Sequence, residues 1–206
     1  MESIKELSKW VAYREDLPFL LNKLGLKGTG AEIGVEKGIF SKHLLEHWHG
    51  EKLYLIDCWR HNPEYNDIAN GDHNIQLDNM AKTFMAVYEH SKRAAIIREF
   101  SVDAATLFQD SSLDFVFLDA DHSYSAVKND IGAWFPKVKK GGLLCGHDYL
   151  DSSYQERKPE GPYFTESGNR IAEFGVKSAV DEWAAKYSKE VMYTANQLFP
   201  FWWTQI

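Results

Sequence analysis

The chain has 206 residues, of which 44% are hydrophobic and 14% aromatic, and its formal net charge is -7. This length and composition predict a globular domain with a sizeable core and argue against an intrinsically disordered chain. The acidic balance argues against nucleic acid as a partner, because a negative surface repels a phosphate backbone.

Cysteine content and apolar runs indicate the compartment. The two cysteines, Cys58 and Cys145, each end an apolar run, so we expect buried strand residues and no disulfide or zinc framework. A reducing, cytoplasmic location fits this usage. No apolar run approaches the roughly 20 residues that span a bilayer, and the N-terminus lacks a signal-like apolar stretch. We therefore expect no membrane partner and no targeting segment.

Residues 1–29 form an extension before the first predicted strand. Leucine, tryptophan, valine and phenylalanine recur there at near-helical spacing around Pro18, which predicts helices packed on the rest of the domain. Three roles remain open for this extension: structural support, a cap over a substrate site, or a contact in a homodimer. Residues 30–206 then form the core of a single domain that spans 1–206.

The stretch AEIGVEKGIFS, residues 31–41, predicts a strand, a tight turn and a helix. Gly34 and Gly38 would allow turn torsion angles that a side chain disfavours and a close approach by a ligand. The helix start offers free backbone N–H groups to a negative group. A GxGxxG dinucleotide fingerprint would need glycine where Glu36 stands, which disfavours a nicotinamide or flavin cofactor.

Four more strands alternate with helices along the chain: Leu53–Trp59, Ala95–Ile97, Leu113–Ala120 and Leu143–Tyr149, the last after a turn at Lys139–Gly142. Two final strands, 190–194 and 199–205, predict a hairpin. The fold class is therefore α/β, with a doubly wound, mostly parallel seven-stranded sheet and a C-terminal antiparallel hairpin. The polar loop 150–173, which follows the strand Leu143–Tyr149, has the length typical of a lid.

Two of the predicted helices carry an apolar face. In the helix 74–90 that face consists of Leu77, Met80, Phe84, Val87 and Tyr88. In the helix 124–134, which Ser123 would cap, it consists of Tyr124, Val127, Ile131 and Trp134.

Polar side chains follow the predicted strands where each one ends. They are Glu32, Asp57, Asp119, His147 and Asp148. Open α/β sheets bind ligands at the carboxyl ends of their strands, so we expect these side chains to converge on one crevice. Asp57 lies where doubly wound folds place a carboxylate for ribose hydroxyls, and Trp59 could wall an adenine.

Five segments, AEIGVEKG, LYLIDCW, FLDADHSYSAVKNDI, KKGGLLCGHDY and GVKSAVDEW, resemble class I methyltransferases that use S-adenosylmethionine. The likeness covers about residues 28–206 and is nearest to a small bacterial branch akin to macrocin and other sugar O-methyltransferases and to catechol O-methyltransferase. It implies that S-adenosylmethionine is the cofactor. The cofactor-binding residues it implies are Glu32, Gly34, Val35, Gly38, Asp57, Cys58, Trp59, Ser101 and Asp119. For Ser101 a helix cap is the alternative.

The same resemblance implies one divalent metal, held by Asp119, His147 and Asp148. His147 departs from the family pattern, which has an oxygen donor there. A histidine ligand favours Mn²⁺, Fe²⁺ or Zn²⁺ over Mg²⁺, and it leaves open a site without metal.

The resemblance also implies the catalytic residues. His122 falls where the catechol enzyme has its catalytic lysine, so we expect it to act as general base, with Asp119 as the second catalytic residue. Asp121 would orient the imidazole or be solvated, and a helix cap is the alternative role for His122. The expected methyl acceptor is a small hydroxylated molecule of the sugar or secondary-metabolite type.

Three other functions remain to be weighed. A non-catalytic cofactor-binding or scaffold protein is one alternative, since fold does not fix function, and a Rossmann-type oxidoreductase is another. Base methylation of nucleic acids is disfavoured, because the segment after the fourth strand lacks the Asp/Asn-Pro-Pro-aromatic run of such enzymes.

Overall fold

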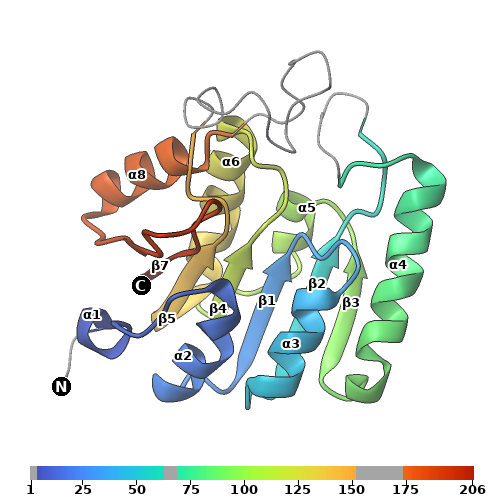
Figure 1. Cartoon of the computed structure of the whole chain (residues 1–206), viewed down its shortest axis with the longest axis horizontal. Helices are drawn as coiled ribbons and strands as arrows, with labels where there is room; N and C mark the ends of the chain where they lie inside the picture. Colours follow the sequence, from blue (N-terminus) through green and yellow to red (C-terminus); the bar gives the residue numbers. More distant parts are fainter. Residues whose placement is uncertain (1–3, 63–68, 152–173) are drawn as a thin grey trace.

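A computed structural model describes residues 4–62, 69–151 and 174–206 (Figure 1). Most of the loop expected to act as a lid, residues 150–173, lies outside the described residues. The segment before the first strand contains α1 (Ile4–Leu7), the 3-10 helix η1 (Arg14–Asp16) and α2 (Leu17–Lys23). No helix in these three described ranges is long and apolar enough to cross a bilayer.

Strands and helices alternate along the rest of the chain. The strands are β1 (Thr29–Ile33), β2 (Lys52–Asp57), β3 (Ala94–Arg98), β4 (Leu113–Leu118), β5 (Val138–Gly146), β6 (Met192–Tyr193) and β7 (Trp202–Gln205). The helices are α3 (Ile39–His47), α4 (His73–Val87), α5 (Ser101–Ala105), α6 (Tyr124–Trp134) and α8 (Val176–Tyr187), and the 3-10 turns η2 (Tyr88–His90) and η3 (Phe135–Lys137) follow α4 and α6.

The strands form one sheet in the order β3-β2-β1-β4-β5-β7-β6. Neighbours among β1 to β5 are parallel, whereas β7 runs antiparallel to both β5 and β6. The predicted α/β class, with its doubly wound sheet and C-terminal antiparallel hairpin, is confirmed.

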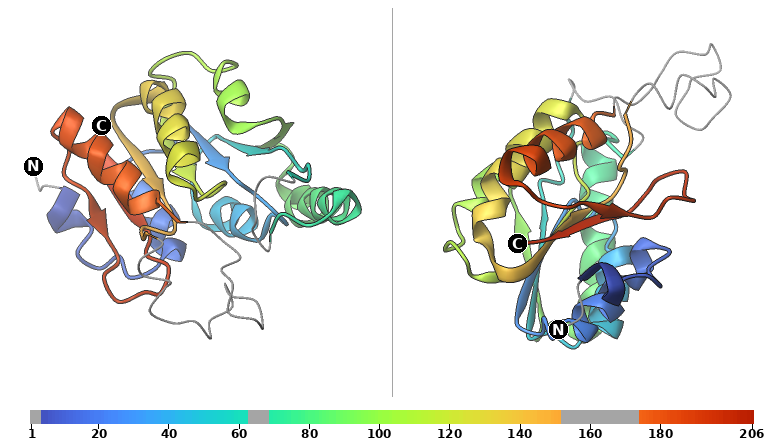
Figure 2. Two further views of the ribbon diagram at one scale, coloured as in Figure 1. Left: turned by 90° about the horizontal axis from the view of Figure 1, so that it is seen from above. Right: turned by 90° about the vertical axis from the view of Figure 1, so that its left-hand side faces the viewer.

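Helices cover both faces of this sheet (Figure 2). Helices α2, α3 and α4 lie on one face, and α5, α6 and α8 lie on the other. Side chains of β4 alternate between the two cores: Val116 and Leu118 belong to the core on the α6 side, and Phe115 and Phe117 to the core on the α3 side. Because both faces are buried, the strands appear in the sequence as continuous apolar runs.

The strand register brings the polar strand ends to one edge. Ile33 of β1 pairs with Ile56 of β2 and with Leu118 of β4, and Leu118 also pairs with Gly146 of β5. The next residues along the chain are Gly34, Asp57, Asp119 and His147, which therefore all emerge at the carboxyl edge of the sheet. This edge includes the switch point between β1 and β4, where doubly wound folds bind ligands.

The packing face of helix α4 agrees only in part with the predicted one: Val87 is buried and Met80 packs against the core on the α3 side, as predicted. Its buried side chains are Gln76, Asn79, Thr83 and Val87, while Phe84 and Tyr88 are 53% and 77% exposed. The hydroxyl of Thr83 donates to the carbonyl oxygen of Glu36, 3.2 Å away, so α4 lies directly against the turn after β1. A small polar side chain suits this close contact better than a large apolar one.

Three further expectations are wrong. Tyr124 does not begin the buried face of α6; it is 38% exposed and its hydroxyl hydrogen-bonds to Glu182. Cys58 is half-buried and follows β2, although Cys145 is buried in β5 as expected. The segment Lys139–Gly142 is not a turn but part of β5, where Gly141, with φ +85°, accommodates an irregularity in the pairing with β4.

Candidate functional site

The turn between β1 and α3 depends on its two glycines. Both have left-handed backbones, with φ of +87° at Gly34 and +73° at Gly38. A Cβ atom on Gly34 would lie 2.1 Å from the carbonyl oxygen of Asp119, and one on Gly38 would lie 3.0 Å from Cα of Thr83. The protein's own backbone thus makes the close approach that the sequence pattern attributed to a ligand.

Asp57 holds this turn from the end of β2. Its Oδ2 accepts hydrogen bonds from the backbone N–H groups of Val35 and Glu36, at 2.9 and 3.0 Å, and its Oδ1 accepts one from Trp59, at 2.8 Å. A carboxylate offers about four lone-pair sites, so these three bonds leave roughly one for a ligand. Asp57 fixes the shape of the turn before any cofactor arrives.

Cys58 and Trp59 follow Asp57, and their side chains are buried to different extents: Trp59 fully and Cys58 in part. The Trp59 side chain is fully buried in the core on the α3 side, and its indole N–H donates to the carbonyl oxygen of Glu36, 2.8 Å away. In this position the ring supports the turn instead of forming an open wall. Cys58 Sγ lies 3.8 Å from the carbonyl oxygen of Arg60, and burial raises the pKa of its thiol.

Glu32 is a buried acid in β1, only 1% exposed. Burial raises its pKa to about 8; the Ser41 hydroxyl opposes this rise and the charge of Asp119 adds to it. Neither Glu32 Oε2 nor Ser41 Oγ meets hydrogen-bond geometry with any residue that the structure describes. A buried carboxyl oxygen without a partner is costly, so this site favours the arrival of a hydrogen-bond donor or cation.

Asp119, His122 and Asp148 form a compact group where β4 and β5 end. His122 Nε2 lies 3.3 Å from Asp119 Oδ1 and 3.1 Å from Asp148 Oδ2. One ligand atom from each residue lies within 4.8 Å of the other two. Burial would raise the pKa of Asp119, but the hydrogen bond to His122 and the charges of His147, His122 and Arg14 hold it below its usual range. The Asp119 carboxyl is therefore ionised at neutral pH.

The structure brings two of the three predicted metal ligands together. Asp119 and Asp148 belong to the group, but His122 joins them where His147 was expected. His147 Nδ1 lies 3.3 Å from Asp148 Oδ2 and 4.0 Å from Asp119 Oδ1, at the side of the group.

Local contacts fix the orientation of His122. Its ring stacks on Phe174, with centroids 5.3 Å apart and planes inclined by 5°. Ser123 is the N-cap of α6 and accepts a hydrogen bond from the N–H of Ala126, so the alternative in which His122 caps the helix is wrong. Asp121 Oδ1 accepts from the N–H of Ser123, 2.8 Å away, and thus supports the loop that carries His122.

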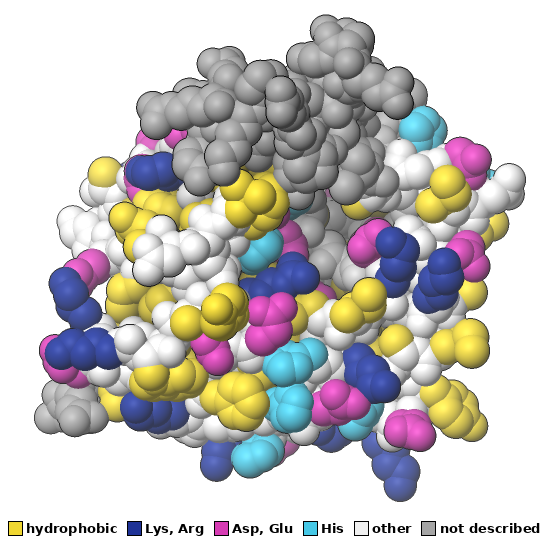
Figure 3. Space-filling view, in the orientation of Figure 1, with side chains coloured by type: hydrophobic (Ala, Val, Ile, Leu, Met, Phe, Trp, Pro, Cys, Tyr) yellow, Lys and Arg dark blue, Asp and Glu magenta, His cyan; other side chains and the backbone are white. Residues whose placement is uncertain are grey.

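Arg14 is a site residue that the sequence analysis missed. It belongs to η1, and its Nη1 donates to Asp119 Oδ2 at 3.0 Å. The guanidinium carbon lies 5.1 Å from the centre of the Phe40 ring in α3. On the face that Figure 3 shows, basic, acidic and histidine side chains gather near the centre. The stretch around Arg14 is short and polar, and no periodicity marks it.

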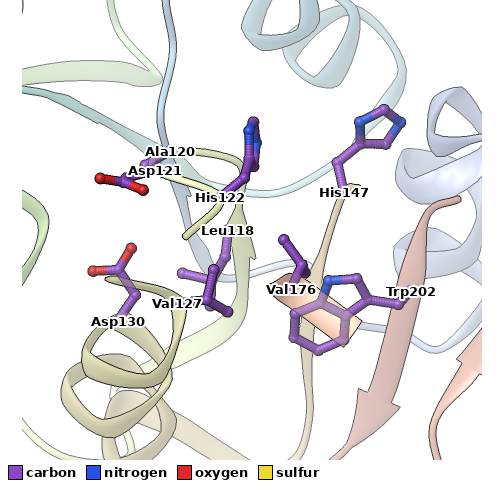
Figure 4. A pocket seen from close by; sticks show the side chains of 9 residues that line it. All are labelled: Leu118, Ala120, Asp121, His122, Val127, Asp130, His147, Val176 and Trp202. Carbon is purple, nitrogen blue, oxygen red and sulfur yellow. The ribbon is translucent and has the colours of Figure 1, made fainter. Parts of the chain in front are cut away.

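A small pocket adjoins the group on the α6 side of the sheet (Figure 4). Its lining consists of Leu118, Ala120, Asp121, His122, Val127, Asp130, His147, Val176 and Trp202. The carboxyl groups of Asp121 and Asp130 point toward one another there. Burial raises the pKa of Asp130 to about 7, opposed by the Ser101 hydroxyl and reinforced by the charge of Asp121. No sequence pattern marks Asp130 either, because an acid within a helix is usually solvated.

Ser101 lies close to this pocket and does not cap α5. The N-cap of α5 is Phe100, and Ser101 Oγ instead accepts a hydrogen bond from the indole N–H of Trp134, 2.9 Å away. Ser101 thereby links α5 to α6 beside Asp130.

Comparisons with known proteins agree with this geometry. Residues 31–149, more than half of the chain, match the model of a family described as a methyltransferase domain. A curated protein of Acanthamoeba polyphaga mimivirus, itself uncharacterized, is 30% identical over 80 residues. That match covers 37% of this chain and 36% of the relative, so the chain spans only about a third of the curated relative it matches.

Solved structures show the same fold. A Staphylococcus aureus protein provisionally assigned as a caffeoyl-CoA O-methyltransferase superposes with a TM-score of 0.66 at 14% identity, covering 100% of this chain and 93% of that one. An O-methyltransferase family protein of Burkholderia thailandensis gives a TM-score of 0.62 at 15% identity, covering 98% of this chain and 57% of that one. At these identities the likeness concerns the fold alone.

Proposed function

Because this chain belongs to the methyltransferase domain family, we propose that it moves the methyl group of S-adenosylmethionine to a hydroxyl of a small molecule. The observation that carries the choice of a hydroxyl is the imidazole of His122 between the carboxylates of Asp119 and Asp148. Two proteins named as O-methyltransferases share the fold. Family membership argues against the oxidoreductase alternative.

In this proposal the cofactor lies along the edge formed by β2, β1 and β4. Asp57 would use its remaining lone pair for a ribose hydroxyl, and Ser101 would lie toward the adenine. Glu32, buried and without a partner for Oε2 among the described residues, would receive the ammonium group. Backbone groups of the turn would line the space between them, at Gly34, Val35, Gly38, Cys58 and Trp59.

The cofactor, once bound, supplies a methyl group that its sulfonium already activates. What the chain must add is in-line positioning and an acceptor for the hydroxyl proton. A sugar-type hydroxyl has a pKa of about 15, near that of water, so it reacts poorly unless its proton leaves as the oxygen–carbon bond forms. His122 accepts this proton, and Asp119 and Asp148 stabilise the resulting imidazolium.

The same three residues fit a divalent cation as a second candidate for activating the hydroxyl. Two carboxylate oxygens and one imidazole nitrogen converge within 4.8 Å, a donor set that suits Mn²⁺, Fe²⁺ or Zn²⁺ better than Mg²⁺. A cation held there would lower the pKa of a neighbouring hydroxyl. His122 would then be a ligand and no longer the base.

Calorimetric titration with S-adenosylhomocysteine, the demethylated cofactor, tests the cofactor assignment. Methyl transfer to a panel of sugar and catechol hydroxyls then compares His122→Asn with His49→Asn, an exposed histidine outside the site. We expect saturable binding in all three proteins and a loss of transfer of about 100-fold or more only in His122→Asn. Full transfer by His122→Asn would remove the assigned role of this residue, and absence of binding to the wild type would refute the proposed function.

A chelator separates the two candidates for activation. Undiminished transfer by the wild type after metal removal identifies His122 as the base, whereas loss of transfer that Mn²⁺ or Zn²⁺ restores identifies it as a metal ligand.

A further inference from the structure

Arg14 lies at the switch point between β1 and β4, where the order of the strands in the sheet reverses. The chain continues from β1 outward to β2 and β3 on one side, and β4 and β5 lie on the other side. Arg14 contacts both halves: Nη1 donates to Asp119, the first residue after β4, and the guanidinium lies over Phe40 in α3, the helix that follows β1. A charged side chain from the N-terminal segment therefore lies at the ligand-binding edge.

The guanidinium retains donors for a ligand. Nη1 is bonded to Asp119 Oδ2 at 3.0 Å, and Nε makes a 3.4 Å contact with the half-exposed Glu15 carboxylate. Nη2 makes no hydrogen bond to any residue in the described ranges, and the side chain is 32% exposed. Arginine has five N–H donors in a planar fork, which matches the two oxygens of a carboxylate.

Arg14 and Glu32 act on each other through space. The positive charge of Arg14 lowers the pKa of Glu32, opposing the rise caused by burial. The two groups thus lie within electrostatic reach of each other. One is a cation with unused donors, and the other is an acid with an oxygen that lacks a partner among the described residues.

We infer that Arg14 binds the carboxylate of the methionine portion of S-adenosylmethionine while Glu32 receives its ammonium group. The inference rests on the proposed function, because it assumes that this cofactor occupies the edge. An α-amino acid carries both charges on one carbon, so its recognition calls for an acidic side chain and a cationic side chain near one another. The Arg14 and Glu32 pair supplies both.

The backbone around Arg14 is already held in place. Asp16 Oδ2 accepts hydrogen bonds from the N–H groups of Ala12 and Tyr13, at 2.8 and 3.0 Å. The carbonyl oxygen of Glu15 lies 2.8 Å from His43 Nε2 in α3, and Leu17 is fully buried. A fixed backbone means that binding need not order this segment, which reduces the entropic cost.

Two ligands separate this role from a general effect on the site. S-adenosylhomocysteine carries the amino acid group, whereas 5′-methylthioadenosine keeps the nucleoside and sulfur but lacks it. Calorimetry gives the Kd of each for the wild type, Arg14→Gln and Arg14→Lys. Lys9→Gln is the matched control, because it removes one positive charge from an exposed site in the same segment. Melting temperatures of all variants verify that they are folded.

We expect Arg14→Gln to raise the Kd of S-adenosylhomocysteine about 10- to 100-fold and to leave that of 5′-methylthioadenosine unchanged. Arg14→Lys should be intermediate, because lysine keeps the charge without the fork, and Lys9→Gln should resemble the wild type. An unchanged Kd for S-adenosylhomocysteine, or an equal loss for both ligands, overturns the inference alone. If the wild type binds neither 5′-methylthioadenosine nor S-adenosylhomocysteine, both the proposed function and this inference are wrong.

Discussion

Gly34 and Asp119 are in direct backbone contact, since a Cβ atom on Gly34 would lie only 2.1 Å from the carbonyl oxygen of Asp119. The turn after β1 is thereby pressed against the end of β4. Replacement Gly34→Ala must separate these two segments and also place alanine at φ +87°. We expect a loss of about 3 kcal/mol or more in the free energy of unfolding, measured by urea denaturation.

Gly25→Ala is the matched control for this prediction. Gly25 has a similar left-handed backbone, with φ +73°, but nothing lies within 4 Å of its Cβ position. It should lose only the conformational cost of about 1–2 kcal/mol. Equal losses in the two variants would show that the contact with Asp119 carries no weight.

The buried acid Glu32 should make stability fall with rising pH. Its pKa is about 8 in the folded chain against an ordinary 4.5, so unfolding between these values releases a proton. The stability due to the protonated carboxyl is complete below pH 4.5 and is lost as the pH rises toward 8, at up to about 1.4 kcal/mol per pH unit. Glu32→Gln should flatten the pH dependence of the unfolding free energy in this window. An unaltered slope in Glu32→Gln would contradict the buried, protonated state.

Asp130, with a pKa of about 7, adds a slope of the same sign, which Asp130→Asn should remove.

Cofactor binding should release a proton from Glu32 near neutral pH. An ammonium group pairs well only with the ionised carboxylate, which is the minor form below pH 8. The affinity for S-adenosylhomocysteine should therefore rise by up to about 10-fold per pH unit between pH 6 and 8. Calorimetry in two buffers of different ionisation enthalpy measures the released proton directly. Glu32→Gln should bind more weakly and release none, and proton release that persists in this variant would assign it to another group.

Metal binding should depend on His122 and not on His147. Asp119, His122 and Asp148 present their ligand atoms within 4.8 Å of one another, whereas His147 lies to one side. We expect His122→Asn and Asp148→Asn to weaken Mn²⁺ or Zn²⁺ binding by at least about 10-fold, measured by equilibrium dialysis. His147→Asn is the control and should bind nearly as the wild type does. The reverse pattern would restore the set that the sequence predicted.

The sequence predicted the sheet and its polar edge well, because both depend on local patterns. The run Leu113–Ala120 is apolar until Asp119, and parallel pairing then places that residue beside the ends of the neighbouring strands. Choosing between His122 and His147 required more than strand ends. The two histidines follow adjacent strands, and only the direction of each side chain decides which one meets both carboxylates.

Close backbone contacts explain the error in α4. Helical periodicity marks Phe84 and Tyr88 as buried, yet the helix presses Thr83 against the glycine turn, where large side chains have no room. Arg14 was missed for another reason. Its partner Asp119 lies 105 positions further along the chain, and no local pattern indicates such a pairing.

The three bonds that Asp57 accepts from the backbone have a consequence for interpreting variants at this position. Replacing Asp57 with alanine would strip acceptors from three amides and let the bend between β1 and α3 drift, so nucleoside affinity would drop even for ligands without a ribose hydroxyl. The carboxylate stabilises the turn between β1 and α3 and is also a candidate contact for the ribose hydroxyls. Ligands that lack the ribose hydroxyls would separate these two contributions in the same variant.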